Sequence, residues 1–62
     1  MPIIQIHLIE GRPVEKKRKL VESVTESVCR VLGVPEDQVR IILSEMAPEH
    51  YAVGGVLKHD TR

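Results

Sequence analysis

The sequence predicts an α/β domain: a β-α-β unit with two parallel strands, followed by a short C-terminal β-hairpin. Two runs rich in β-branched residues, at 3–9 and 39–46, flank an amphipathic stretch at 13–32. Strand, helix and strand in this order normally give parallel strands joined by a right-handed crossover. A glycine pair near the end indicates the hairpin. We therefore expect one domain that spans residues 1–62.

The first predicted strand begins directly after Pro2 and ends before Gly11. Residues 3–9 are mostly isoleucine and leucine on both alternating faces, which is typical of a strand that is covered on two sides. Pro13 then suits the first turn of a helix, where its missing N–H costs nothing. These signals predict that the strand gives way to a helix at about residue 13.

The helix predicted at 13–32 has its apolar residues at steps of one, three and four, which gathers them on one face. They are Leu20, Val21, Val24, Val28, Val31 and Leu32. Gly33 is a suitable helix terminator because it tolerates the left-handed conformation. A turn at 34–37, either irregular or with one tight helical turn, precedes the strand at 39–46.

The last segment predicts a turn and a hairpin. Residues 47–50 contain a proline and break the second strand, and residues 51–57 are extended on either side of Gly54 and Gly55. Two consecutive glycines permit the positive φ angles of a tight hairpin turn.

The small size of the chain predicts an oligomer. A chain of 62 residues buries only about 60% of its unfolded surface, so small domains commonly need disulfides, metals or partners. The single cysteine, Cys29, excludes an intrachain disulfide, and His7, His50 and His59 lack zinc-site spacing. We expect two copies to pair by their sheet edges into a four-stranded sheet with both helices on one face. The other, still apolar, face favours a larger assembly.

Charge and hydropathy exclude other classes of protein. Nine basic and nine acidic residues balance to a net charge of zero, whereas a general nucleic-acid binder has a basic excess. The basic run at 16–19 spreads around the helix and is interpreted as solvated surface. No apolar run reaches the roughly 20 residues of a membrane span, and no signal peptide is visible. We expect a cytoplasmic protein without nucleic-acid or membrane partners.

Pro2 is the candidate reactive group. Methionine aminopeptidases act when the second residue is small, and removal of Met1 would turn the Pro2 nitrogen from an amide into a secondary amine. A free α-amino group has a pKa of roughly 7.7–8.0, and burial or nearby cations lower that pKa. Such an amine is a usable general base. Alternatively, Pro2 merely begins a strand and aids processing.

Short motifs along nearly the whole chain, taken together, resemble the 4-oxalocrotonate tautomerase family. The matching pieces are Pro2, the run at 3–7, Glu10-Gly11-Arg12, Val39-Arg40, Glu45-Met46-Ala47, His50-Tyr51 and Val53-Gly54-Gly55. The family's length and spacing also agree.

The resemblance implies an isomerase that interconverts enol and keto forms of unsaturated 2-keto (di)carboxylic acids, 2-hydroxymuconate-like, without metal or organic cofactor. It assigns the general base and acid to Pro2. Arg40 polarises the 2-keto oxygen and its carboxylate, and Arg12 binds the distal carboxylate. Tyr51, where the family commonly has phenylalanine, and Ile9 complete the substrate-binding set. The resemblance further implies a hexamer, a trimer of dimers, in which the arginines reach the proline from neighbouring subunits.

Other interpretations of these residues remain. Arg12 could be a solvated loop residue, and Arg40 could form an intersubunit salt bridge with a glutamate. Related dehalogenases and hydratases of unsaturated acids are an alternative, but the dehalogenases place a glutamate after the aromatic position, where this chain has Ala52 and Val53. The second alternative is a non-catalytic oligomer on the same scaffold. The resemblance is compatible with a role in aromatic catabolism and with a broader, promiscuous activity on several enols.

Overall fold

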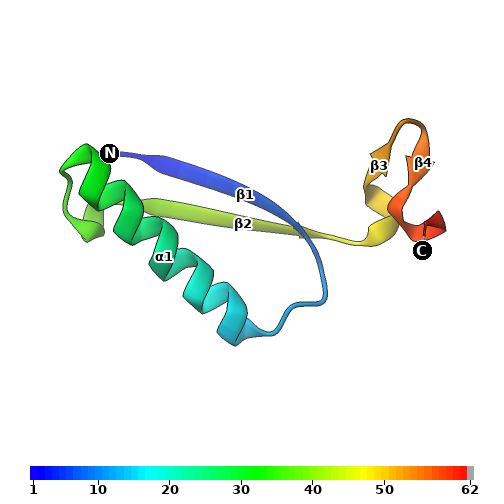
Figure 1. Cartoon of the computed structure of the whole chain (residues 1–62), viewed down its shortest axis with the longest axis horizontal. Coiled ribbons are helices and arrows are strands. Elements are labelled where there is room, and N and C mark those ends of the chain that lie inside the picture. Colours follow the sequence, from blue (N-terminus) through cyan, green and yellow to red (C-terminus); the bar gives the residue numbers. More distant parts are fainter. Residues whose placement is uncertain (62) are drawn as a thin grey trace.

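The computed structural model describes residues 1–61 and contains the predicted β-α-β unit (Figure 1). Strand β1 (Ile3–Ile9) pairs in parallel with β2 (Arg40–Met46), from Ile3 opposite Arg40 to Ile9 opposite Met46. Helix α1 (Val14–Leu32) connects the two strands along one side of the sheet. The parallel pairing is confirmed, and β2 begins one residue later than the sequence indicated.

Backbone angles and hydrogen bonds explain where α1 begins and ends. Pro13 is the extended residue just before the helix (φ −69°, ψ 158°), one position earlier than the predicted first turn. Its carbonyl accepts hydrogen bonds from the N–H groups of Lys16 and Lys17. Gly33 ends the helix in the left-handed conformation (φ 68°) and donates its N–H to the Cys29 carbonyl at 2.9 Å. The predicted terminator is confirmed.

The connections after α1 are short single helical turns, and the predicted C-terminal hairpin is confirmed. The 3₁₀ turns are η1 (Glu36–Gln38), η2 (Pro48–His50) and η3 (Lys58–Asp60). Strands β3 (Ala52–Val53) and β4 (Val56–Leu57) pair antiparallel across Gly54 and Gly55, whose φ angles are 60° and 85°. The hairpin stands apart from the β-α-β unit, beyond the C-terminal end of β2 (Figure 1).

The register separates two unlike faces of the sheet. One face is half-buried and carries Ile4, Ile6, Leu8, Ile41 and Leu43. On the other face, Ile3 and Ile42 are 63% and 50% exposed. Polar Gln5, His7 and Ser44 lie between them. The open face is therefore mixed, and the expectation of an apolar face is wrong. The strand register places these polar residues on the same side as the isoleucines.

Two residues of the predicted apolar helix face lie in solvent. Val31 and Leu32 are 75% and 59% exposed, while Leu20, Val21, Val24 and Val28 are half-buried. A helix of 19 residues is about 28 Å long, and a strand of seven residues is about 23 Å long. The last turn of α1 therefore extends past what one pair of strands can cover.

The chain is extended for its size. Its radius of gyration is 14.6 Å and its extents are 42 × 24 × 14 Å, whereas a compact chain of this length has a radius of about 11 Å. Its accessible surface is 5022 Å², against about 4,000 Å² for a folded monomer of this mass. None of residues 1–61 is buried. A lone protomer thus leaves its apolar core open to solvent.

Candidate active site

Pro2 and Arg40 lie together at the front of the sheet. Pro2 is half-buried, and its carbonyl accepts a hydrogen bond of 3.1 Å from the N–H of Arg40. Met1 before it is 78% exposed. This exposure leaves Met1 open to removal, and the backbone hydrogen bond fixes Pro2 beside the first residue of β2.

The Arg40 side chain is exposed and turns back toward η1. Its Nη1 donates to the Asp37 carbonyl oxygen at 2.5 Å. Within residues 1–61 the guanidinium meets no carboxylate. A guanidinium has five N–H donors, so a single hydrogen bond leaves most of its charge and its donors free for an anionic ligand. A salt bridge with a glutamate, the alternative interpretation of Arg40, would require another copy of the chain.

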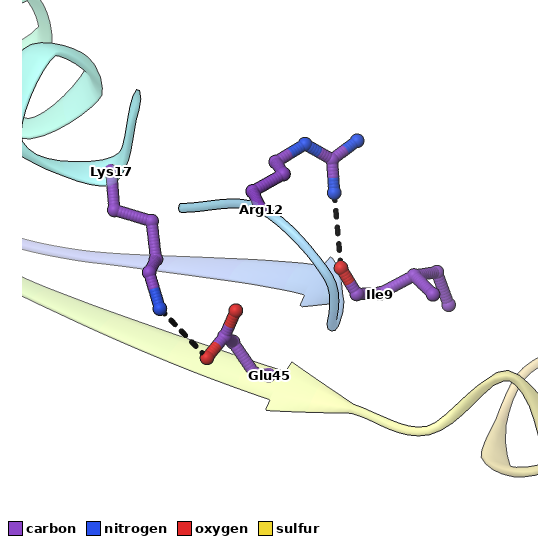
Figure 2. A network of polar contacts seen from close by, with 4 residues as sticks. All are labelled: Ile9, Arg12, Lys17 and Glu45. Atoms are coloured by element: carbon purple, nitrogen blue, oxygen red, sulfur yellow. Dashed lines mark hydrogen bonds and ion pairs between the residues drawn. The ribbon is translucent and has the colours of Figure 1, made fainter. Parts of the chain in front are cut away.

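Ile9, Arg12 and Tyr51 lie together at the opposite end of the sheet. They line an open cavity of about 270 Å³, together with His7, Leu8 and Met46. Arg12 donates from Nη1 to the carbonyl oxygen of Ile9 at 3.0 Å, as Figure 2 shows. Tyr51 is 46% exposed. A cation and an aromatic ring beside an apolar wall suit a conjugated carboxylic acid.

The predicted site residues therefore form two groups rather than one. The strand that separates Pro2 from Arg12 has seven residues and spans about 23 Å. The structure brings Pro2 near Arg40 and gathers Ile9, Arg12 and Tyr51, but no single chain joins the two groups. A complete site that contains Pro2 and Arg12 requires a second protomer.

The larger concavity of the protomer lies elsewhere. It measures about 630 Å³ and is lined by Val21, Glu22, Thr25, Glu26, Cys29 and Glu36. None of these is a predicted site residue. The hollow lies along the flank of α1 beside η1.

One polar contact near the site was missed from the sequence. Lys17 and Glu45 form an ion pair, with Nζ and Oε1 3.0 Å apart (Figure 2). The pattern of charges predicts solvated surface for the whole run at 16–19. Only Lys17 of that run is half-buried, because it lies one turn before Leu20 on the sheet-facing side. The i, i+3 spacing of Lys17 and Leu20 was the available signal.

Two searches of the described part of the chain gave no candidates. Among residues 1–61, no group of three or more His, Cys, Asp or Glu side chains is placed to hold a metal ion. No helix in the same range is long and apolar enough to cross a bilayer.

Comparisons with known proteins agree over the full chain. The model of the family described as tautomerase enzyme matches residues 2–61. A 2-hydroxymuconate tautomerase of Pseudomonas putida is 45% identical, covering 100% of this chain and 98% of that protein. A structure from work on the 4-oxalocrotonate tautomerase isozymes of Methylibium petroleiphilum is 50% identical over 94% of this chain and 91% of that chain, with a TM-score of 0.92.

A second similar structure is that of a subunit from a hexameric enzyme. It comes from the heterohexamer 4-oxalocrotonate tautomerase of Chloroflexus aurantiacus J-10-fl, with a TM-score of 0.94 and 32% identity over the whole of both chains. The chain described here belongs to the tautomerase family and is an isomerase of the 4-oxalocrotonate tautomerase type. The family and fold class expected from the sequence are confirmed.

Proposed function

We propose that this protein, once Met1 is removed, tautomerises unsaturated 2-keto (di)carboxylic acids such as 2-hydroxymuconate, with Pro2 as general base and acid. The observation that carries the proposal is the place of Pro2: it is half-buried at the front of β1, beside Arg40 and behind an exposed methionine. The name of the Pseudomonas putida relative supports the substrate class.

The proposed reaction is a proton transfer in two halves. The neutral Pro2 amine takes a proton from the enol hydroxyl or from a carbon beside the keto group, and the protonated amine returns it to another carbon of the conjugated chain. Negative charge develops on the 2-oxygen during the transfer. A fixed guanidinium at that oxygen stabilises the transition state, and we assign this role to Arg40.

Arg12 has the binding role in this proposal. One of its guanidinium nitrogens is held by the Ile9 carbonyl oxygen, and the remaining donors can pair with a carboxylate at the far end of the substrate. Ile9 and Tyr51 in the same cavity supply an apolar wall and a ring against the conjugated chain. These contacts orient the reacting carbon toward the amine.

We further propose that the site forms between protomers of a hexamer. Antiparallel pairing of two β1 edges would place Pro2 of one chain beside residues 9–12 of the other, because the strand ends then lie side by side. The pairing would also cover part of the surface that a lone protomer leaves exposed. The heterohexamer of the Chloroflexus aurantiacus relative supports an assembly of this size.

The proposed function is tested by intact mass and an enol-ketonisation assay on the same sample. We expect a mass that lacks Met1 and rapid loss of the enol absorbance of 2-hydroxymuconate. A processed protein that leaves the enol at its spontaneous rate would refute the proposal.

The assembly is tested separately by sedimentation. We expect one species about six times the mass of the chain at micromolar concentration. A folded monomer of 7.0 kDa would refute the shared site.

A further inference from the structure

We propose that the Lys17–Glu45 ion pair holds the loop that carries Arg12 and so sets the preference for dicarboxylate over monocarboxylate substrates. Lys17 and Glu45 are positioning residues in this proposal: they act through Arg12 and do not touch the substrate. The selectivity half of the inference rests on the proposed function, while the ordering of the loop does not.

The loop at 10–13 is fixed at both ends by backbone hydrogen bonds. At its start, the N–H of Glu10 donates to the Met46 carbonyl at the end of β2, at 2.8 Å. At its end, the Pro13 carbonyl accepts from the N–H groups of Lys16 and Lys17, at 3.1 and 3.4 Å. One anchor belongs to the sheet and the other to the first turn of α1.

The ion pair joins these two anchors. Glu45 directly precedes Met46, and Lys17 is itself a donor to Pro13, so their contact of 3.0 Å ties the helix start to the end of β2 (Figure 2). It is the only side-chain hydrogen bond within residues 1–61 that links α1 to the sheet. The two side chains are 23% and 33% exposed, so solvent weakens the pair less than it weakens a fully exposed one.

The loop between the anchors has little else to hold it. Residues 10–13 are all exposed, and Gly11 has a φ of 126°. Glycine has wide backbone freedom because it lacks a Cβ atom. Within residues 1–61, the Arg12 side chain has one hydrogen bond, to the Ile9 carbonyl oxygen. Bidentate pairing with a carboxylate demands a defined guanidinium position. If the start of α1 were no longer held to the end of β2, the guanidinium would occupy a wider range of positions.

A direct role of the Lys17 charge makes a different prediction. If the ammonium itself attracted the substrate, loss of Lys17 would weaken binding, whereas loss of the Glu45 carboxylate would strengthen it. If the pair positions Arg12, both losses weaken dicarboxylate binding in the same direction. The sign of the Glu45 effect therefore separates the two roles.

The experiment uses the processed full-length protein and four variants. Lys17→Gln and Glu45→Gln each break the pair, and Lys17→Glu with Glu45→Lys restores it in reverse. Lys19→Gln is the matched control, since it removes one positive charge from an exposed position of the same helix. The readouts are hydrogen exchange at the amides of Glu10 and Lys16, which anchor the two ends of the loop, and KM and kcat for a dicarboxylate and a monocarboxylate enol.

We expect both single variants to speed exchange at the bonded amides of Glu10 and Lys16. They should also raise KM for the dicarboxylate by about three- to fivefold, a size that a partly exposed ion pair supports. The KM for the monocarboxylate and both kcat values should stay unchanged, the reversed pair should recover the parent values, and Lys19→Gln should match the parent. Unchanged exchange in the single variants, or a lower KM in Glu45→Gln, overturns the inference. An inactive parent protein refutes the proposed function instead, and the exchange data then still decide whether the pair orders the loop.

Discussion

The two ends of β1 carry different chemistry. The front end presents Pro2, a potential amine, next to Arg40, whose guanidinium has one backbone partner. The far end presents Arg12 and Tyr51 around an open cavity. One end suits proton transfer and charge stabilisation, and the other suits recognition of a carboxylate. A strand of seven residues keeps them about 23 Å apart, so in the proposed assembly a protomer would hold half of each of two sites.

In the proposed assembly, this separation would link the stability of so small a chain to its catalysis. A lone protomer has no buried residue within 1–61 and more surface than a compact chain of its mass. The proposed assembly would cover the apolar surface and complete the site with the same contacts. Folding stability and catalysis would then depend on one event, the meeting of the front end of one chain with the far end of another.

The largest expected effect is at the front end. A chain made by chemical synthesis with Met1 retained should show no catalysed tautomerisation, because the amide nitrogen of Pro2 has no basic lone pair near neutral pH. The processed Pro2→Ala variant should only slow the reaction, since a primary amine remains. Ketonisation assays on samples of verified mass distinguish these cases. Full activity of a homogeneous Met1-retaining sample would rule out Pro2 as the base, and Glu10 or Glu45 would become candidates.

The pH profile of the processed enzyme should also report the pKa of the Pro2 amine. In the proposed site a guanidinium would lie beside the Pro2 amine and disfavour its charged form. We therefore expect the acidic limb of kcat/KM to report a pKa below the roughly 7.7–8.0 of an ordinary α-amino group. Activity should be lost as the pH falls through that pKa, because the base becomes protonated. If the Arg40→Ala variant shows the same pKa in the acidic limb, Arg40 is not the group that lowers the pKa of the amine.

Arg40→Ala should have the next largest effect, and it should act on turnover. Loss of one fixed donor to a developing oxyanion typically lowers kcat by about 10²–10³-fold, while the ground-state complex keeps its contact with Arg12. Steady-state kinetics with a 2-keto dicarboxylate test this expectation. A higher KM with unchanged kcat would assign Arg40 to binding alone.

Arg12→Ala should have a smaller effect, and it should act on binding. We expect KM for a dicarboxylate to rise about tenfold, the loss of roughly 1.4 kcal/mol of binding free energy, with kcat nearly unchanged. A monocarboxylate enol provides the control substrate, because it has no distal carboxylate to lose. An equal rise in KM for both substrates would contradict the assignment of distal-carboxylate recognition to the far end of β1.

The smallest signal tests whether the two ends meet across chains. Met1-retaining chains and processed Arg12→Ala chains are mixed, dissociated in denaturant and refolded together. Some sites should then combine an intact Pro2 from one chain with an intact Arg12 from the other, so activity at low dicarboxylate concentration should exceed the mean of the two parents. Activity equal to that mean would indicate that Pro2 and Arg12 of one chain serve the same site.

The sequence by itself determined the local structure. The β-branched runs, the helical spacing of Leu20 and Val24, and the positive-φ glycines at the turns give their elements through short-range sterics and patterning, which is why the order of elements agrees with the structure. It also indicated Pro2 as the reactive group, because the chemistry of an N-terminal proline follows from its position in the chain.

Only the tertiary structure decided which residues lie near each other. The parallel register places Arg40 at Pro2 and leaves Arg12 at the far end, and a run of charges at 16–19 gives no sign that Lys17 alone reaches Glu45. The same register mixes Gln5 and His7 with isoleucines on the open face. These outcomes depend on strand pairing and helix docking across 28 or more residues of chain, and no local propensity specifies a contact at that separation.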